Sequence, residues 1–138
     1  MEIIFKNSIT VEEYNDLREA VGWDKLCADQ ALQGLKNSTR IISCYHKGKI
    51  VGSARLIWDK GYICYLSDVM VSPEFQKNGI GRQMVESLLQ YLKAQIKPGW
   101  KIKVVLTSRK GKEDFYKKLG FIERPNSELG PAMEQWIK

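Results

Sequence analysis

The sequence predicts an α/β fold in which one mixed central β-sheet is flanked by helices. Three observations predict it. The chain has 138 residues, enough for one domain with its own core, so residues 1–138 are expected to form a single domain. Runs with the period of a strand alternate with runs of helical period. No internal repeat or linker interrupts them, and the expected order is β-α-α-β-β-β-α-β-α-β-β.

The first elements are a short strand and two helices. An apolar run at residues 3–5 predicts the strand, and Thr10 with Glu13 forms a capping-box pair at the start of a helix. The apolar face of this helix carries Val11, Tyr14, Leu17 and Val21. Gly22 ends it, and Asp24 is expected to cap a second helix. The apolar positions of the second helix are Leu26, Ala31, Leu32 and Leu35.

Three strands and two hairpins come next. Residues 40–45, 49–58 and 62–71 are rich in β-branched and aromatic residues, which favours strands. The connections at 46–48 and 59–61 each end in glycine and predict hairpin turns. This part of the chain is therefore expected to form an antiparallel meander.

A long amphipathic helix follows, of about four to five turns. Its apolar face carries Ile80, Met84, Val85, Leu88, Leu89, Leu92 and Ile96. Pro98 and Gly99 end it, and residues 102–106 alternate as a further strand. Residues 111–119 then predict a short helix closed by Gly120. Two last strands are expected at 121–122 and 133–137.

Composition limits the classes of function. Hydrophobic residues make up 43% of the chain and charged residues 28%, as in soluble globular proteins. No apolar run approaches the roughly 20 residues that span a bilayer, and the N-terminus lacks a signal-like stretch. We therefore expect a cytoplasmic protein with no membrane partner. The net charge of +6 comes from scattered basic residues without a long basic run, which disfavours nucleic acid as a partner.

The cysteines do not predict a metal site or a disulfide framework. Cys27, Cys44 and Cys64 form no C-x-x-C pair, and His46 is the only histidine. Cys44 and Cys64 lie in apolar strand-like runs, where a small buried thiol is expected. A cysteine nucleophile would need a partner base, and His46 lies in a predicted turn. We expect neither a metal nor a catalytic cysteine.

The segment at residues 69–82 carries the strongest functional signal. An apolar strand enters a tight loop that runs directly into the long helix. A helix N-terminus presents unpaired N–H groups that attract phosphate. Gly79 and Gly81 let the backbone approach such a ligand. Gln76 and Arg82 add a polar and a cationic side chain that can extend toward it. The glycine spacing matches neither a Walker loop nor a dinucleotide fingerprint.

The glycine pattern instead resembles that of a known family. Gln76-Lys77-Asn78-Gly79-Ile80-Gly81 is similar to the Q/R-x-x-G-x-G/A pyrophosphate loop of the GCN5-related N-acetyltransferase (GNAT) superfamily. The strand end at residues 68–73 resembles that family's fourth strand. Residues 115–121, F-Y-K-K-L-G-F, resemble its late F-Y-x-x-x-G-F signature. The resemblance extends in order over nearly the whole chain.

The resemblance implies an activity. It implies direct acetyl transfer from acetyl-CoA to a primary amine, with a small-molecule amine as the expected acceptor. A protein amine is the alternative acceptor, and a non-catalytic acyl-CoA sensor of the same fold is the alternative function. It leaves a homodimer open and implies no metal.

The resemblance also implies where the cofactor is held. Pyrophosphate would lie on the amides from Gln76 to Arg82, a segment that includes Lys77, Asn78, Gly79, Ile80 and Gly81. Pantetheine would lie between the diverging ends of two strands, against Val69, Met70 and Val71, with Ser108 and Phe115 as further contacts. An amide in the segment 69–71 would face the thioester carbonyl. Many relatives carry an asparagine after the fifth strand, but residues 107–112 contain none, so Ser108 or a backbone group is expected to replace it.

Four residues are candidates for the chemistry. The resemblance makes Tyr116 the acid for the CoA thiolate, because a phenol with an ordinary pKa of about 10 can deliver a proton to a thiolate. Packing or cofactor binding is the alternative for Tyr116. Asp68 is the candidate base, with loop fixing or a water chain as alternatives. Tyr65, three residues earlier and expected on the opposite strand face, is the other option for the base and a candidate substrate contact. Trp23 is a candidate substrate wall or a core residue.

Overall fold

The computed structural model describes residues 1–138, which form two compact units, Met1–Leu106 and Thr107–Lys138. The predicted α/β class is confirmed, because a five-stranded mixed sheet carries helices on both faces. The first unit contains the whole sheet and three of the four α-helices. None of the helices has the length and the apolar content needed to cross a membrane.

The sheet has the strand order β1-β2-β3-β4-β5. The strands are Ile4–Lys6, Arg40–His46, Lys49–Trp58, Ile63–Val71 and Lys103–Val105. The first three pairings are antiparallel, and β5 joins β4 in parallel. The expected meander is therefore confirmed, with a two-residue turn at Lys47 and Gly48, both at positive φ.

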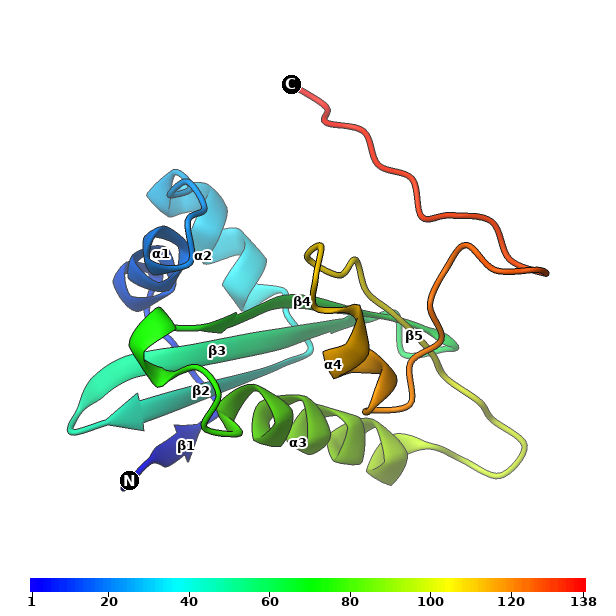
Figure 1. The fold of residues 1–138 in the computed structure, drawn as a ribbon, viewed down its shortest axis with the longest axis horizontal. Coiled ribbons are helices and arrows are strands. Elements are labelled where there is room, and N and C mark those ends of the chain that lie inside the picture. Colours follow the sequence, from blue (N-terminus) through cyan, green and yellow to red (C-terminus); the bar gives the residue numbers. More distant parts are fainter. The chain divides into compact units, whose positions relative to one another are not determined.

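Helices α1 (Val11–Ala20) and α2 (Ala28–Lys36) cover one face of the sheet, and α3 (Ile80–Gln95) covers the other (Figure 1). The capping box at Thr10 and Glu13 is confirmed. The prediction that Asp24 caps α2 is wrong, because the helix begins after Cys27 and no side chain caps it. Asn15 holds the preceding segment against α1 instead, since its side chain bonds both the amide and the carbonyl of Leu26.

The α3 face of the sheet is closed and apolar. Its fully or nearly fully buried side chains are Ile42, Cys44, Ala54, Leu56, Cys64 and Leu66, against Ile80, Met84, Val85, Leu88 and Leu92 of the helix. Gly52 lies where the first turns of α3 come closest. A Cβ there would meet Ile80 at 3.3 Å and Met84 at 3.2 Å. This close packing fixes the start of α3 against β3.

The second unit contains α4 (Glu113–Lys117) and no strand. The prediction of strands at 121–122 and 133–137 is therefore wrong. A strand needs a neighbour to satisfy its backbone groups, and this unit offers none. The apolar side chains that suggested the last strand are exposed, with Met133 at 92% and Ile137 at 85%. An alternating apolar pattern was therefore not sufficient to form a strand here.

Candidate active site

Strand β4 is regular at its start and kinked near its end. The register with β3 shifts between Ser53 and Arg55, so Ala54 lies opposite an extra residue of β4. This is a β-bulge, and Asp68 forms it at a φ of 55°. Aspartate is one of the few residues besides glycine that enter this left-handed region readily. The bulge re-aims the strand just before the predicted cofactor loop.

Beyond the bulge, β4 has a strand on one side only. β5 pairs with β4 from Ile63 to Tyr65, whereas β3 follows β4 to Val71. Val69, Met70 and Val71 therefore lie in the one-sided stretch, as expected of a strand that diverges from its neighbour. Met70 as a whole residue is 1% exposed, and it packs in the α1–α2 core.

The loop between β4 and α3 is braced by its own amide side chains. Gln76 Nε2 donates to the Val71 carbonyl at 2.9 Å. Asn78 Nδ2 donates to the carbonyls of Phe75 and Gln76, both at 3.1 Å. Lys77 and Gly79 have positive φ, which folds the chain back toward the helix. Gln76 and Asn78 thus shape the loop, and Lys77 is exposed.

The N-terminus of α3 has no partner within the protein of the kind that α1 has. Gly79 is the N-cap, no side chain caps the helix, and its first turn contains no acidic residue. In contrast, α1 has a full capping box and two acidic residues in its first turn. Ile80 is buried and anchors the start of α3, while Arg82 is exposed and pairs with Glu86 at 2.8 Å. The positive end of α3 is suited to an anion.

Asp68 also lies at the centre of a largely buried cluster of polar side chains. Its Oδ2 accepts a 2.5 Å hydrogen bond from the Tyr14 hydroxyl and a 2.8 Å bond from Arg55 Nε. The Arg55 and Asp68 side chains are 15% and 14% exposed. Burial, followed by the charge of Asp68, raises the pKa of Tyr14. Burial alone would lower the pKa of Arg55, but the charge of Asp68 and its hydrogen bond raise it.

Sequence reasoning missed two members of this cluster. Tyr14 was expected only to pack on the apolar face of α1, and Arg55 was not singled out. The available signal was a lone arginine in the middle of a mostly apolar strand. Long charged side chains are rarely buried without a partner, so Arg55 predicts a buried acid nearby.

Tyr65 and Asp68 lie on the same face of the sheet, so the expectation of opposite faces is wrong. Tyr65 pairs with Ile57 and Ser67 pairs with Arg55, which places all four on one face. Asp68 bonds the Arg55 side chain and therefore joins that face. The physical reason is the bulge, because one extra residue reverses the alternation of the strand.

Trp23 lies in the connection between α1 and α2, half-buried against the α1–α2 core. The Arg18 guanidinium lies 5.5 Å from its ring and 5.8 Å from the ring of Tyr14. Trp23 is thus partly used in packing and partly exposed.

The second unit holds the remaining predicted residues. Tyr116 lies in α4 with its ring edge-on to Phe115 at 5.0 Å and to Phe121 at 5.9 Å. The Tyr116 carbonyl accepts bonds from the amides of Leu119 and Phe121. Ser108 Oγ donates to the Arg109 carbonyl. The F-Y-x-x-x-G-F signature thus forms a small aromatic cluster around Tyr116.

The two buried cysteines are not activated nucleophiles. Cys44 and Cys64 are buried and Cys27 is exposed. Burial raises the pKa of both buried thiols, and for Cys64 burial and then the charge of Asp59 raise it to about 11. Since the thiolate is the reactive form, neither buried thiol suits a covalent step.

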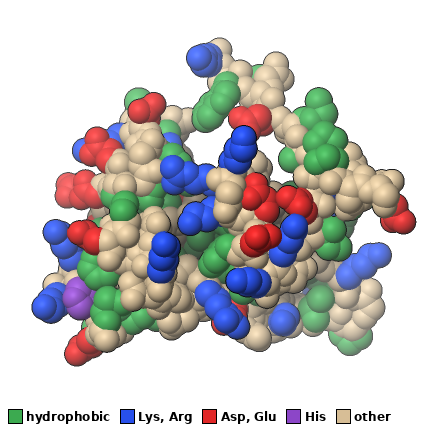
Figure 2. Space-filling view, in the orientation of Figure 1, with side chains coloured by type: hydrophobic (Ala, Val, Ile, Leu, Met, Phe, Trp, Pro, Cys, Tyr) green, Lys and Arg blue, Asp and Glu red, His purple; other side chains and the backbone are tan.

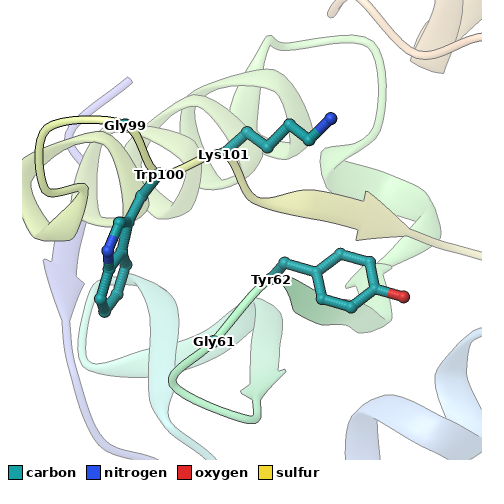
Figure 3. Close-up of a pocket in the computed structure, with 5 residues that line it drawn as sticks. All are labelled: Gly61, Tyr62, Gly99, Trp100 and Lys101. Atoms are coloured by element: carbon teal, nitrogen blue, oxygen red, sulfur yellow. The ribbon is translucent and has the colours of Figure 1, made fainter.

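A shallow pocket of about 320 Å³ lies at the opposite end of β4, lined by Gly61, Tyr62, Gly99, Trp100 and Lys101 (Figure 3). It adjoins the amino ends of the parallel strands β4 and β5, whereas the bulge and the loop lie toward the carboxyl end of β4. It is therefore separate from the predicted site. Basic and acidic side chains are intermixed across the visible surface (Figure 2), in keeping with their scatter in the sequence.

Comparison with known proteins gives the family. The model of the acetyltransferase (GNAT) domain matches residues 10–130. The Pyropia yezoensis protein named uncharacterized N-acetyltransferase ycf52 is 35% identical over 128 residues, which cover 89% of this chain and 71% of that protein. Histone acetyltransferase TAP1 of Glycine max is 27% identical over 142 residues, covering 94% of this chain and 60% of that protein.

A solved structure gives the same fold. A protein of meticillin-resistant Staphylococcus aureus, described as a probable acetyltransferase, superposes with a TM-score of 0.85 at 23% identity. The match covers 97% of this chain and all of that one. Together with the matched domain model and the N-acetyltransferase relatives, these findings establish that the chain belongs to the GNAT family and is an acetyltransferase.

Proposed function

We propose that the chain transfers the acetyl group of acetyl-CoA directly to a primary amine of a small molecule. The observation that carries the proposal is the combination of an uncapped helix N-terminus with a strand that has lost one neighbour. The loop from residue 72 to residue 79 joins the two, and Gln76 ties that loop to the end of β4. A phosphate group suits the helix end, and an extended amide chain suits the open strand edge.

In this proposal the backbone does most of the binding. Amides of residues 80–82 at the start of α3 face the pyrophosphate, and Gly79 and Gly81 leave room for it. Pantetheine pairs with the open edge of residues 69–71. An amide of the same segment donates to the carbonyl oxygen of the thioester as negative charge develops there. The open edge after Tyr65 supports this assignment.

Tyr116 is the proposed acid that protonates the CoA thiolate as it leaves. The matched F-Y-x-x-x-G-F signature supports this role, and the rings of Phe115 and Phe121 limit the movement of the Tyr116 ring. Phe115 and Ser108 are proposed to lie along the cofactor.

Deprotonation of the amine is proposed to proceed through water, and the amine attacks in a ternary complex. The burial of Cys44 and Cys64, which raises the pKa of both thiols, disfavours an acetyl-cysteine intermediate on either of them, because such an intermediate needs an accessible thiolate. Trp23 and Tyr65 are proposed to border the acceptor. A protein amine is the second candidate acceptor, favoured by the similarity to a protein named as a histone acetyltransferase.

Gly81→Glu tests the cofactor site. A carboxylate in the first turn of α3 would repel phosphate and fill its approach. We expect acetyl-CoA affinity to fall about 10²-fold or more, measured by calorimetry, which corresponds to roughly 3 kcal/mol. Ser87→Glu is the matched control, since it adds the same charge to an exposed position of the same helix. Unchanged affinity in Gly81→Glu would remove the assignment.

Tyr116→Phe tests the chemistry. We expect the turnover number to fall by about 10²–10⁴-fold with little change in acetyl-CoA affinity, because only the acid is removed. Tyr62→Phe removes a phenol from the pocket at the amino end of β4 and should have no effect. An amine panel that includes polyamines, amino sugars and lysine peptides separates the two acceptor classes. Intersecting initial-rate lines would support a ternary complex, and parallel lines with an acetylated protein would contradict it.

A further inference from the structure

We propose that Tyr14, Arg55 and Asp68 form a positioning cluster that sets the geometry of the β4 bulge, with Asp68 acting as its centre and not as the general base. The inference rests on the proposed function, in which the amides of residues 69–71 serve acetyl transfer. It assigns roles to Tyr14 and Arg55 and changes the role expected for Asp68.

One carboxylate oxygen connects four elements of the fold. Asp68 Oδ2 in β4 accepts from Tyr14 of α1 and from Arg55 of β3. Arg55 Nη1 in turn donates to the Gly34 carbonyl at 3.2 Å and to Ser38 Oγ at 3.1 Å, at the end of α2. The bulge is therefore tied to both helices that cover this face of the sheet.

The backbone conformation of Asp68 explains why these hydrogen bonds matter for the site. A φ of 55° is unfavourable for most residues, and it persists where surrounding interactions hold it. Tyr14 and Arg55 hold the side chain of Asp68, which is the bulged residue itself. Val69 follows directly, so the orientation of the Asp68 peptide sets the direction of the amides at residues 69–71. A displacement of about 1 Å at such amides can reduce a rate by 10²-fold.

The same geometry argues against Asp68 as the base. The side chain is only 14% exposed, which limits the access of water or an amine to the carboxylate, and its Oδ2 already accepts two hydrogen bonds. Protonation of Asp68 would remove the negative charge that pairs with the buried Arg55 guanidinium. A base must gain a proton in each turnover, whereas a positioning group must keep the hydrogen bonds that hold it.

Two substitutions at Asp68 separate these roles. Asparagine at this position would keep an oxygen that accepts hydrogen bonds and would tolerate positive φ. Asp68→Asn should lose stability, because Arg55 loses its negative partner, but the positioning role predicts a turnover number per folded molecule within about tenfold of wild type. Asp68→Ala loses both properties and should fall by about 10²-fold or more, with acetyl-CoA affinity little changed. A general base predicts equal losses in both variants, because neither retains a carboxylate.

Tyr14→Phe provides the coupling test. It removes one hydrogen bond and keeps the ring, so it should lower turnover in the wild-type background and have no further effect in Asp68→Ala. Three outcomes would each contradict the proposed positioning role. These are equal losses in the two Asp68 variants, wild-type activity in both, and additive effects of Tyr14→Phe and Asp68→Ala.

An acceptor-independent measurement keeps the inference separate from the proposed function. NMR chemical shifts of the Val69, Met70 and Val71 amides should move in Asp68→Ala and stay near wild type in Asp68→Asn. Should Asp68→Ala fail to fold, Tyr14→Phe should move the same signals. Unmoved signals overturn the inference. If wild-type protein binds no CoA and acetylates no amine, the proposed function fails, while these shifts still decide the cluster.

Discussion

The two faces of the sheet differ in the kind of side chains that they bury. On the α3 face, apolar side chains from three strands meet five buried side chains of one helix, and Gly52 allows the helix to approach closely. On the α1–α2 face, an apolar cluster shares the space with a largely buried ion pair, two buried serines and a bulge. The first face carries no group suited to chemistry.

The difference separates stability from function. Apolar burial stabilises without requiring exact geometry, so the α3 face can anchor the start of α3 firmly. A buried ion pair contributes little net stability compared with apolar packing, but removing one partner typically costs about 3–5 kcal/mol. Polar groups on the α1–α2 face therefore specify a particular arrangement of the backbone. The predictions below test this division.

Leu88→Ala should cause the largest loss of stability. Leu88 is 1% exposed on the α3 face, and truncating such a side chain typically costs about 2–5 kcal/mol. The turnover number per folded molecule should not change, since this face only supports the sheet. Chemical denaturation and an activity assay measure the two quantities. Leu32→Ala on α2 is the control, because Leu32 is 47% exposed and should have a much smaller effect. A folded Leu88→Ala protein with lost activity would contradict the division.

A matched pair of glycines compares the faces directly. Gly52→Ala places a methyl group 3.2 Å from the Met70 carbonyl and from Met84 Cε, so we expect a loss of about 1–3 kcal/mol through overpacking. Gly34→Ala, inside α2, meets only Arg55, whose Nη1 lies at 3.7 Å. It should stabilise the protein by about 0.5–1 kcal/mol, because alanine favours a helix. Thermal unfolding of both variants measures the contrast, and a stabilising Gly52→Ala would show that the α3 face is loosely packed.

The smallest expected effect is a loss of stability at alkaline pH. Burial, followed by the charge of Asp68, raises the pKa of Tyr14 above its ordinary 10.0. The folded chain therefore holds the phenolic proton more tightly than the unfolded chain. This contribution is fully present below pH 10 and is lost as the pH rises through the folded pKa. The stability difference between wild type and Tyr14→Phe, measured by denaturation at several pH values, should shrink above pH 10. A difference independent of pH would contradict the burial of Tyr14 beside Asp68.

Local signals in the sequence predicted much of the fold. The capping box at Thr10 and Glu13, the two hairpin turns and the apolar face of α3 each depend on residues that lie close together in the chain. The position of the loop before α3 was predictable for the same reason, since its glycines and the following helix are contiguous. The start of α2 was not predictable, because Asn15 of α1 holds the segment before it.

The sequence by itself determined the α/β class, the order of the elements up to α4 and the family motif at the start of α3. These follow from the periodicity and spacing of residues that are close together in the sequence, and they do not depend on contacts between distant parts of the chain. Only the tertiary structure decided that Asp68 lies in a bulge, that Tyr65 shares its face, and that Tyr14 and Arg55 meet its carboxylate. It also decided that residues 133–137 form no strand. The physical reason is common to all of these: strand register, bulges and buried ion pairs depend on partners that lie far apart in the sequence, so no local pattern encodes them.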